Sequence, residues 1–274
     1  AKISGVRNVI THAGNPAQKY GSKNFWKSII LVQIGRLFTN KIICCSKYVG
    51  KSVIESFNLS NAEVTNIYNC FDEELFTFKE EYKIKILKAA SEKKIVLGMV
   101  ARMERHKDQE SLIKAVKVLK EKNFRIKLLL IGDGSQRGKL EQLTKTLDLS
   151  NQVIFLGAIN NVSKKLDDVD IFVFSTTEDE GFGVALAEAM GKGVPIVASN
   201  VEACSETLLN GKCGLLFDFN SPNSIYKAVE RVLDYPEETF NRVKAANDHA
   251  LNNFTKMKMA ELYFQELFKN KIYK

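Results

Sequence analysis

Short apolar runs alternate with longer segments of helical character along most of the chain. The runs are rich in Ile, Val, Leu and Phe and predict buried strands, whereas the segments between them carry no internal helix breaker. The expected strands are 6–11, 41–45, 64–68, 95–100, 127–131, 153–155, 170–174, 195–198 and 214–217; the expected helices are 24–39, 47–57, 109–120, 136–147, 162–166, 184–190, 222–233, 236–252 and 256–269, with a polar, helical connection over 72–93. Strands that alternate with helices are typical of parallel α/β sheets, which is the fold class that we expect.

Composition and charge narrow the class of protein without identifying it. A chain of 274 residues with 45% hydrophobic content can bury a large core, as one large domain or two ordinary ones. Its net charge of +8 would suit nucleic acid, an anionic membrane face or phosphorylated ligands. Because the lysines have acidic neighbours and no aromatic residues interleave with the basic ones, we expect a basic, solvated surface and no nucleic-acid partner.

The cysteines and the lengths of the apolar runs indicate in which part of the cell the protein works. The five cysteines form no CxxC pair and no zinc spacing, so we expect a reducing, cytoplasmic setting, no metal, and Cys44 and Cys45 buried in a strand. No run reaches the roughly eighteen apolar residues of a membrane span, and the start lacks the apolar core of a signal peptide, so we expect a soluble protein. Ala1 stands where an initiator methionine would, and we expect part of the protein to be missing.

Two carboxylates flank a glycine-containing turn that opens a helix, in the stretch from Glu180 to Glu188. The turn follows a buried strand at its carboxyl end, where ligands gather in open α/β sheets. Gly181 and Gly183 let the backbone approach a ligand, and free N–H groups at 183–185 could face an anion. The pattern therefore predicts a site for a diphosphate at the start of this helix.

The two carboxylates fit different tasks in glycosyl transfer. Glu180, in the loop, could contact the sugar or the positive charge that develops at its anomeric carbon. Glu188, within the helix, could accept hydrogen bonds from ribose hydroxyls. The alternative is that both are solvated surface residues, as most glutamates are.

Here the chain resembles the retaining family 4 glycosyltransferases of the GT-B fold, the glycosyl transferases group 1 type. The residues that carry the resemblance are Glu180-Gly-Phe-Gly-Val-Ala-Leu-Ala-Glu-Ala-Met-Gly-Lys-Gly-Val-Pro-Ile-Val-Ala-Ser199, Glu206, Gly211-Lys-Cys-Gly-Leu-Leu-Phe217, Gly98-Met-Val-Ala-Arg-Met-Glu-Arg-His-Lys-Asp108, Leu129-Leu-Ile-Gly-Asp-Gly134 and Val153-Ile-Phe-Leu-Gly157. Each piece alone is weak evidence, but their joint order is specific. The resemblance implies a nucleotide-sugar transferase.

The resemblance also implies an organisation into two Rossmann-like, doubly wound parallel sheets, of which the first is incomplete in this chain. Residues 1–75 would be the closing part of an acceptor-side domain, 76–254 the nucleotide-sugar-binding domain, and 255–274 a terminal helix that crosses back to the first domain. The family's glycine-containing loop after its first strand has no counterpart here. A non-catalytic or fragmentary nucleotide-sugar-binding module is therefore the alternative to a working transferase.

Further site residues follow from the resemblance. Arg102 and Lys107, in one loop, would neutralise the diphosphate; Asp133 would lie beside the nucleotide, and His12 would contact the donor sugar. Gly181, Phe182, Gly183 and Val184 would line the donor together with the catalytic Glu180 and the ribose-binding Glu188. The alternatives are two surface cations, a turn-forming aspartate and a structural histidine. His106 and His249 are expected to be a loop residue and a helix-surface residue without a role in the site.

The implied reaction is transfer from a nucleotide sugar to an acceptor hydroxyl with retention of configuration, without metal or separate cofactor. The acceptor would be a glycan or a lipid-linked oligosaccharide, and the basic surface would suit peripheral docking at a membrane face. A sugar-nucleotide epimerase would need acid and base residues that the sequence does not supply. A nicotinamide dehydrogenase is disfavoured because no strand leads into a GxGxxG turn.

Overall fold

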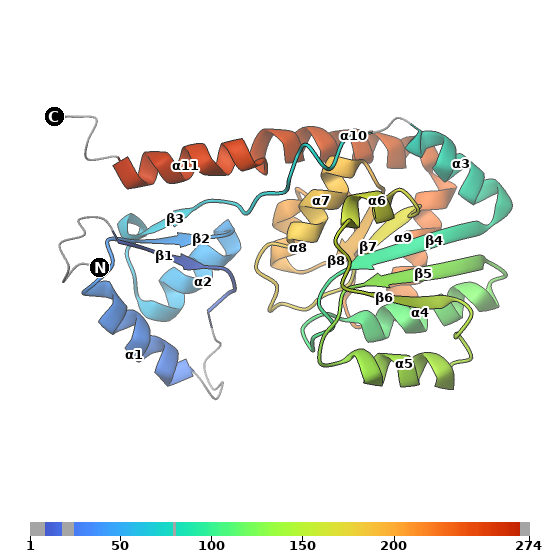
Figure 1. The fold of residues 1–274 in the computed structure, drawn as a ribbon, viewed down its shortest axis with the longest axis horizontal. Coiled ribbons are helices and arrows are strands. Elements are labelled where there is room, and N and C mark those ends of the chain that lie inside the picture. Colours follow the sequence, from blue (N-terminus) through green and yellow to red (C-terminus); the bar gives the residue numbers. More distant parts are fainter. Residues whose placement is uncertain (1–8, 18–24, 79–80, 269–274) are drawn as a thin grey trace.

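The chain folds into two parallel α/β units, a smaller one with three strands and a larger one with six (Figure 1). The computed structural model describes residues 9–17, 25–78 and 81–268. In the first half lie β1 (Ile10–Ala13), α1 (Phe25–Arg36), β2 (Lys41–Cys44), α2 (Lys47–Phe57), a short 3-10 helix (Asn61–Glu63) and β3 (Val64–Asn66). In the second half lie α3 (Tyr82–Glu92), β4 (Lys94–Val100), α4 (Gln109–Glu121), β5 (Arg125–Ile131), α5 (Arg137–Thr146), β6 (Val153–Gly157), α6 (Val162–Leu166), β7 (Ile171–Phe174), α7 (Val184–Lys192), β8 (Ile196–Ser199), α8 (Glu202–Thr207), β9 (Leu215–Phe217), α9 (Pro222–Asp234), α10 (Pro236–Asn253) and α11 (Lys256–Phe268).

The strand order places a topological switch point in the larger sheet. Its strands run β6-β5-β4-β7-β8-β9, and every pair is parallel. The chain therefore moves outward from β4 in one direction and returns to the other side of β4 with β7. The loops that follow β4 and β7 diverge there, and this is where ligands bind in open α/β sheets. The smaller sheet is also parallel, in the order β1-β2-β3.

Two hydrophobic clusters hold these layers together, one on each face of the larger sheet. Successive strand residues point to opposite faces, so Ile171 and Val173 belong to one cluster whereas Phe172 and Phe174 belong to the other. The first cluster lies wholly within the second half of the chain. The second cluster extends into the first half, where it includes buried Cys44 and residues of α2. The two halves therefore share part of one core.

An aromatic cluster forms the centre of that shared core. The ring of Phe254, at the end of α10, lies 5.2 Å from that of Tyr68 and 5.1 Å from that of Phe182. Tyr68 follows β3, and Phe182 lies in the loop before α7, so the cluster joins three distant parts of the sequence. Beyond it, α11 lies along the three-stranded sheet (Figure 1), with Lys41 Nζ 3.3 Å from a Glu266 carboxylate oxygen.

The α/β class with two parallel sheets is confirmed, and most predicted elements agree with the structure to within two or three residues at each end. Cys44 and Cys45 are fully buried, as predicted. Three predictions need correction. The first strand occupies Ile10–Ala13 rather than 6–11, of which 6–8 lie outside the described residues; the helix within 72–93 covers only Tyr82–Glu92; and α8 was not predicted, because it is short and Glu-rich.

Candidate functional site

Two loops at the switch point are bound to each other by several hydrogen bonds, three of which share one backbone carbonyl. The carbonyl oxygen of His106, in the loop after β4, accepts hydrogen bonds from Thr177 N at 3.0 Å, Thr176 Oγ1 at 2.9 Å and Thr177 Oγ1 at 3.2 Å. Asp108 N, at the end of the same loop, donates to the Ser175 carbonyl at 3.1 Å. The loop that carries Arg102 and Lys107 is therefore fixed against the loop that carries Glu180.

Glu180 and Lys107 form an ion pair in this corner, and both side chains are about nine-tenths buried. The Lys107 ammonium also lies 4.7 Å from the centre of the Phe174 ring, within reach of a cation–π interaction. Burial acts to raise the pKa of Glu180, but Lys107 and the N–H groups of Gly181 and Phe182 outweigh it, so the pKa lies below its usual range. Glu180 is thus held as an anion in a site that is largely shielded from water.

The turn into α7 lies next to this ion pair. Gly183 is the N-cap of α7 with φ of 83°, a left-handed conformation that favours glycine, and no side chain caps the helix. A Cβ at this position would lie 3.1 Å from the Phe174 ring, the same ring that Lys107 covers. The structure therefore brings the predicted cation and the predicted helix start together, and Val184 is 38% exposed beside them. Such a helix start can hold an anion.

Arg102 is exposed on the same loop, and its guanidinium has no hydrogen bond or ion pair to the part of the chain that the structure describes. Its positive charge nevertheless acts on the neighbouring His106. Burial lowers the pKa of His106. The positive charges of Lys107 and Arg102 lower this pKa further, whereas the negative charge of Glu180 raises it. Arg102 thus belongs to the same electrostatic cluster and remains available to a ligand. His106, for which we predicted no role in the site, interacts electrostatically with all three of these residues.

Glu188 is the second predicted carboxylate and lies on α7. Burial raises its pKa to about 7, and no cation or hydrogen-bond donor among the described residues offsets this. Glu188 is therefore suited to accept hydrogen bonds from hydroxyl groups.

Two predicted site residues, and one histidine for which we expected no role, have roles in the fold itself. Asp133 is exposed and accepts from Gly134 N and Arg137 Nη1, both at 2.8 Å, so its geometry is that of the turn-forming alternative. The Phe182 side chain is 2% exposed and packs in the aromatic cluster, which leaves only its backbone to face a ligand. His249 is half-buried rather than a surface residue, because its ring packs edge-on against Phe254 at 4.9 Å.

The first half approaches the site through the turn after β1. A Cβ on Gly181 would overlap the carbonyl of Gly14, so only glycine fits where the two halves meet. His12 lies on β1, two residues before Gly14, with its side chain exposed. The structure thus places the strand of His12 at the edge of the loop that holds Glu180. The contact of His12 with a sugar stays a prediction.

The start of α2 contributes contacts that the sequence did not predict. Ser46, its N-cap, is buried and donates from Oγ to the Gly181 carbonyl at 2.6 Å. Glu206, on α8 of the other half, accepts from Lys47 N and Tyr48 N, both at 2.8 Å. A carboxylate at a helix N-terminus satisfies free N–H groups and complements the helix dipole. Glu206 was part of the recognised motif, but its partner lies 159 residues away along the chain.

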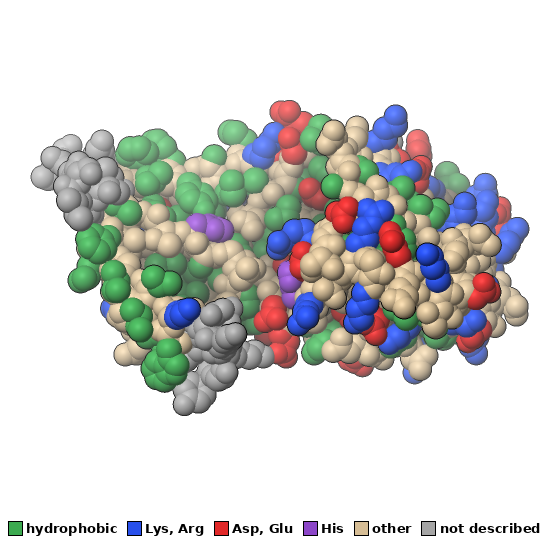
Figure 2. Space-filling model, turned by 60° about the horizontal axis from the view of Figure 1, so that its bottom comes forward, with side chains coloured by type: hydrophobic (Ala, Val, Ile, Leu, Met, Phe, Trp, Pro, Cys, Tyr) green, Lys and Arg blue, Asp and Glu red, His purple; other side chains and the backbone are tan. Residues whose placement is uncertain are grey.

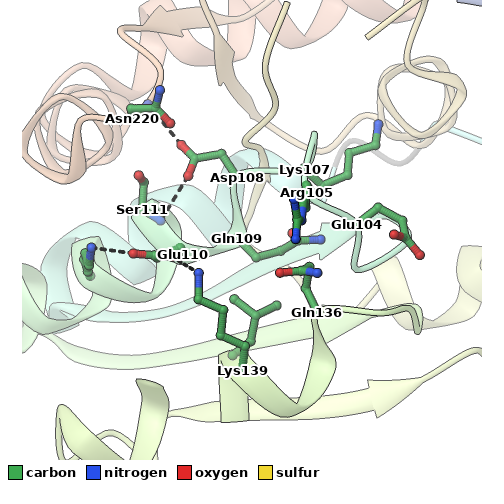
Figure 3. A pocket seen from close by; sticks show the side chains of 12 residues that line it. Glu104, Arg105, Lys107, Asp108, Gln109, Glu110, Ser111, Gln136, Lys139 and Asn220 are labelled. Carbon is green, nitrogen blue, oxygen red and sulfur yellow. Dashed lines mark hydrogen bonds and ion pairs between the residues drawn. The ribbon is translucent and has the colours of Figure 1, made fainter. Parts of the chain in front are cut away.

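A hollow of about 660 Å³ lies on the other side of the loop after β4 (Figure 3). Figure 3 shows Lys107 extending away from Asp108, Ser111 and Glu110, which face the hollow. Asp108 accepts from Ser111 N at 3.3 Å and Asn220 N at 3.0 Å, while Glu110 is bound by two lysines. These groups satisfy one another, so the hollow differs from the corner around Glu180, where the Arg102 guanidinium has no hydrogen bond or ion pair within the described part of the chain.

The fold and the site together define an α/β protein with two parallel sheets and a cluster of charged side chains at the switch point of the larger one. A family model described as "Glycosyl transferases group 1" matches residues 80–249, which is more than half of the chain. The chain belongs to this family. The suspected resemblance is thereby confirmed, as is the GT-B architecture.

Relatives and solved structures are consistent with this membership. The chain is 27% identical over 204 residues to N-acetyl-alpha-D-glucosaminyl L-malate synthase of Bacillus anthracis, covering 74% of this chain and 53% of that protein. It is 26% identical over 259 residues to N-acetylgalactosamine-N,N'-diacetylbacillosaminyl-diphospho-undecaprenol 4-alpha-N-acetylgalactosaminyltransferase of Campylobacter jejuni, covering 89% and 68%. The crystal structure of Anabaena HepE with UDP-glucose superposes with a TM-score of 0.83 at 21% identity, covering 96% of this chain and 72% of that one.

The chain spans about half the length of some of these relatives, such as the Bacillus anthracis synthase and the glycosyltransferase EpsF of Bacillus subtilis, of which it covers 53% each. The match to solved structures at this identity concerns the fold. The division at residues 75 and 254, and the roles of the individual site residues, stay predictions.

Proposed function

We propose that this chain is the donor-binding part of a glycosyltransferase that moves a sugar from a nucleoside diphosphate to an acceptor hydroxyl, with retention of configuration. The observation that carries the proposal is the buried Glu180–Lys107 pair beside the open helix start at Gly183, with Arg102 and Glu188 free of partners among the described residues. The HepE structures hold UDP, UDP-glucose or UDP with glucose, which supports a nucleotide sugar as the donor here.

Donor binding would rearrange the ion pair. Lys107 neutralises Glu180 in this structure, and a diphosphate at the start of α7 would compete for its ammonium. Lys107 would then contact the diphosphate together with Arg102, and Glu180 would turn to the sugar. Burial near Phe174 and the aromatic cluster keeps water away from these charges, which strengthens each interaction.

The transfer step itself needs no metal and no separate cofactor in this proposal. The bond from the anomeric carbon to the diphosphate oxygen breaks, and its electron pair leaves with the diphosphate. The acceptor oxygen forms its bond on the same face, and its proton passes to the departing phosphate oxygen. Glu180 stabilises the positive charge at the anomeric carbon, His12 orients the sugar, and Glu188 holds the ribose.

The acceptor and the cellular location of the reaction are inferred from the family, because no residue of this chain indicates them. We propose a glycan or lipid-linked acceptor, in polysaccharide or glycolipid assembly at the cytoplasmic face of a membrane. The name of the Campylobacter jejuni relative describes transfer to a glycan carried on diphospho-undecaprenol, which supports this class. Among the described residues, no helix combines the length and the apolar character needed to cross a membrane.

Donor binding is tested with Arg102→Ala, because the exposed side chain can be removed without disturbing the core. Calorimetric titration with UDP-glucose, GDP-mannose and ADP-glucose identifies the donor class, and we expect one of them to bind. Loss of one charge-assisted contact to phosphate should weaken that binding by roughly tenfold to a hundredfold. Arg105→Ala, an exposed arginine of the same loop, is the matched control and should change affinity by less than about twofold. Equal losses in both variants would contradict the assignment.

The catalytic role of Glu180 is tested separately. Glu180→Gln should lower the transfer rate by about a hundredfold or more without weakening donor binding, because the carboxylate acts mainly on the charge of the transition state and its neutralisation frees Lys107 for the diphosphate. The anomeric configuration of the product, read by NMR, tests retention. Donor binding without transfer to any glycan or lipid-linked acceptor would favour the non-catalytic binding module instead.

A further inference from the structure

Two adjoining hollows lie between α2 and α8, where the two halves of the molecule meet (Figure 1). Their volumes are about 540 Å³ and 500 Å³, which is within the range of small-molecule sites. The two share four lining residues, Tyr48, Glu202, Ser205 and Asn210, and together they form the joint hollow.

Each helix contributes one polar face to the joint hollow. Side chains three and four residues apart lie on the same face of a helix. The lining residues follow this spacing on both helices: Lys47, Tyr48, Lys51, Ser52 and Glu55 on α2, and Glu202, Ser205 and Glu206 on α8. The joint hollow therefore has one wall from each half of the molecule.

Much of this polar lining is not used by the fold. The side chains of Lys47, Lys51, Glu55 and Glu202 are exposed, and none of them makes a hydrogen bond or ion pair within the part of the chain that the structure describes. Glu206 differs, because its carboxylate caps α2. Donors on two ammonium groups and acceptors on two carboxylates thus remain available to a ligand.

The mixture of charges disfavours a charged ligand. Two lysines and four glutamates line the joint hollow. A phosphate would lie against the carboxylates, and a cation would lie against the lysines. On the face of the molecule shown in Figure 2, basic and acidic side chains likewise lie close together near the centre, where the halves meet. An uncharged ligand with many hydroxyl groups suits such a lining, because each hydroxyl can donate to a carboxylate and accept from an ammonium group.

Tyr48 connects the joint hollow to the candidate site. Its side chain lines both hollows, and the face of an aromatic ring can pack against the C–H bonds of a sugar ring. Its hydroxyl donates to the Glu178 carbonyl at 2.9 Å, two residues before Glu180. The joint hollow therefore adjoins the loop that holds the candidate catalytic carboxylate.

We propose that the joint hollow binds uncharged sugar residues of a glycan, outside the donor site. Lys51 and Glu202 contact the sugar hydroxyls from opposite walls, and Tyr48 packs against the ring. The proposal rests on the proposed function, in which the acceptor is a glycan, and adds where sugars beyond the reacting one are held.

Saccharide binding is tested without donor or transfer, by NMR titration of the nitrogen-15-labelled chain. The probes are three neutral trisaccharides: maltotriose, mannotriose and tri-N-acetylchitotriose. We expect at least one of them to cause saturable shifts at the amides of α2 and α8. Trigalacturonate, of the same size but with three carboxylates, should bind at least about tenfold more weakly.

Three results would overturn the proposal. The first is the lack of a saturable shift with any neutral trisaccharide, and the second is trigalacturonate that binds as tightly as they do. The third is a set of shifts confined to residues outside α2 and α8. A nucleotide sugar that still binds in any of these cases would leave the donor site intact.

A matched pair of double variants locates the contact. Lys51→Ala with Glu202→Ala should weaken binding of the trisaccharide at least about tenfold, because both walls lose a polar contact. Lys88→Ala with Glu92→Ala removes the same two residue types from exposed positions of α3 and should change this binding by less than about twofold. Affinity for the nucleotide sugar should match that of the parent in both.

Equal loss of trisaccharide binding in both pairs would contradict a specific role for the joint hollow. Should the first double variant fail to fold, Lys51→Ala and Glu202→Ala are tested singly. Each should weaken binding by about threefold. Unchanged binding in both single variants would also overturn the proposal.

Discussion

The six-stranded half of the molecule exposes its large hydrophobic residues at positions scattered over several helices and loops, whereas the three-stranded half exposes a group of them on α1 and directly after it. One cluster of buried residues lies wholly within the larger half, while the smaller half shares its core with its neighbour. The larger half therefore has the core of an independent domain, and the smaller half depends on contacts beyond itself. Some of these contacts are visible, in the aromatic cluster and at Glu206. Among the described residues, the apolar side chains on the outer side of α1 stay largely exposed.

The largest expected effect comes from removing the aromatic ring at the joint. Phe254→Ala should lower the free energy of unfolding by about 3 to 5 kcal/mol, because a large buried ring leaves a cavity between both halves. Urea denaturation measures the loss. Phe264→Ala, on α11 with a 58% exposed side chain, is the control and should change stability by less than about 0.5 kcal/mol. If the larger half depends little on its neighbour, the variant will unfold in two separate transitions; a single shifted transition would mean that the halves unfold together.

The next effect concerns Glu188, within the larger half alone. Its folded pKa of about 7 lies above the unfolded value near 4.5, so its favourable contribution is complete below pH 4.5 and is lost as the pH rises through about 7. The parent should therefore lose free energy of unfolding as the pH rises from 5 to 8, whereas Glu188→Gln should not. The difference between the two proteins should grow across this range by up to about 3 kcal/mol. Urea denaturation at both pH values measures the difference. An identical effect at pH 5 and pH 8 would contradict a carboxylate whose pKa is raised by partial burial.

The same carboxylate should link donor binding to pH. Ribose hydroxyls that donate to the ionised form would lower its pKa, so binding should release a proton near pH 7 and strengthen as the pH rises from about 6 to 8. A nucleotide sugar is the suitable probe, because its diphosphate diester does not titrate there. Calorimetry in buffers of different ionisation enthalpy counts the protons. Glu188→Gln should abolish the release.

A smaller effect is expected where one half caps a helix of the other. The hydroxyl of Tyr68 lies beside the Glu206 carboxylate that caps α2. Burial and this carboxylate raise the pKa of Tyr68. Glu206→Gln should cost about 1 to 2 kcal/mol, because two N–H groups lose a charged acceptor. Hydrogen exchange at the amides of Lys47 and Tyr48 should quicken. Glu202→Gln, exposed on the same helix, should leave those amides unchanged.

The smallest effect is expected at Asp133, where the structure shows a turn rather than a ligand contact. Asp133→Asn keeps the acceptor for Gly134 N and loses only a surface ion pair with Arg137. Donor affinity, measured by the same titration, should change by less than about twofold. A loss of donor affinity of tenfold or more would indicate that Asp133 does contact the nucleotide.

The sequence predicted what depends on local pattern and missed what depends on pairing at a distance. Ile171–Phe174 is apolar and bounded by a turn, and such a strand can be recognised from its neighbours. The start of α7 was predicted for the same reason, since Gly183 and the helix that follows are contiguous. The partner of Lys107 is Glu180, 73 residues away, and no local signal shows that two site residues neutralise each other.

The remaining misses have the same origin. Ser46 was recognisable as a helix cap, but its hydrogen bond to the Gly181 carbonyl depends on how the halves meet. An aspartate after a strand is common both in turns and in ligand contacts. Only the geometry of Asp133 in the structure favours the turn. The exposed apolar side chains of α1 could not be predicted, because a helix that is apolar on all sides is usually buried.

The contact between Gly181 and the Gly14 carbonyl sets how closely the two halves approach each other. Backbone lies against backbone there, with no side chain between them. An alanine at 181 would place a methyl group in this contact and push the turn after β1 away from the loop that holds Glu180. The absence of a side chain at one position thus fixes the spacing of the two units beside the candidate site.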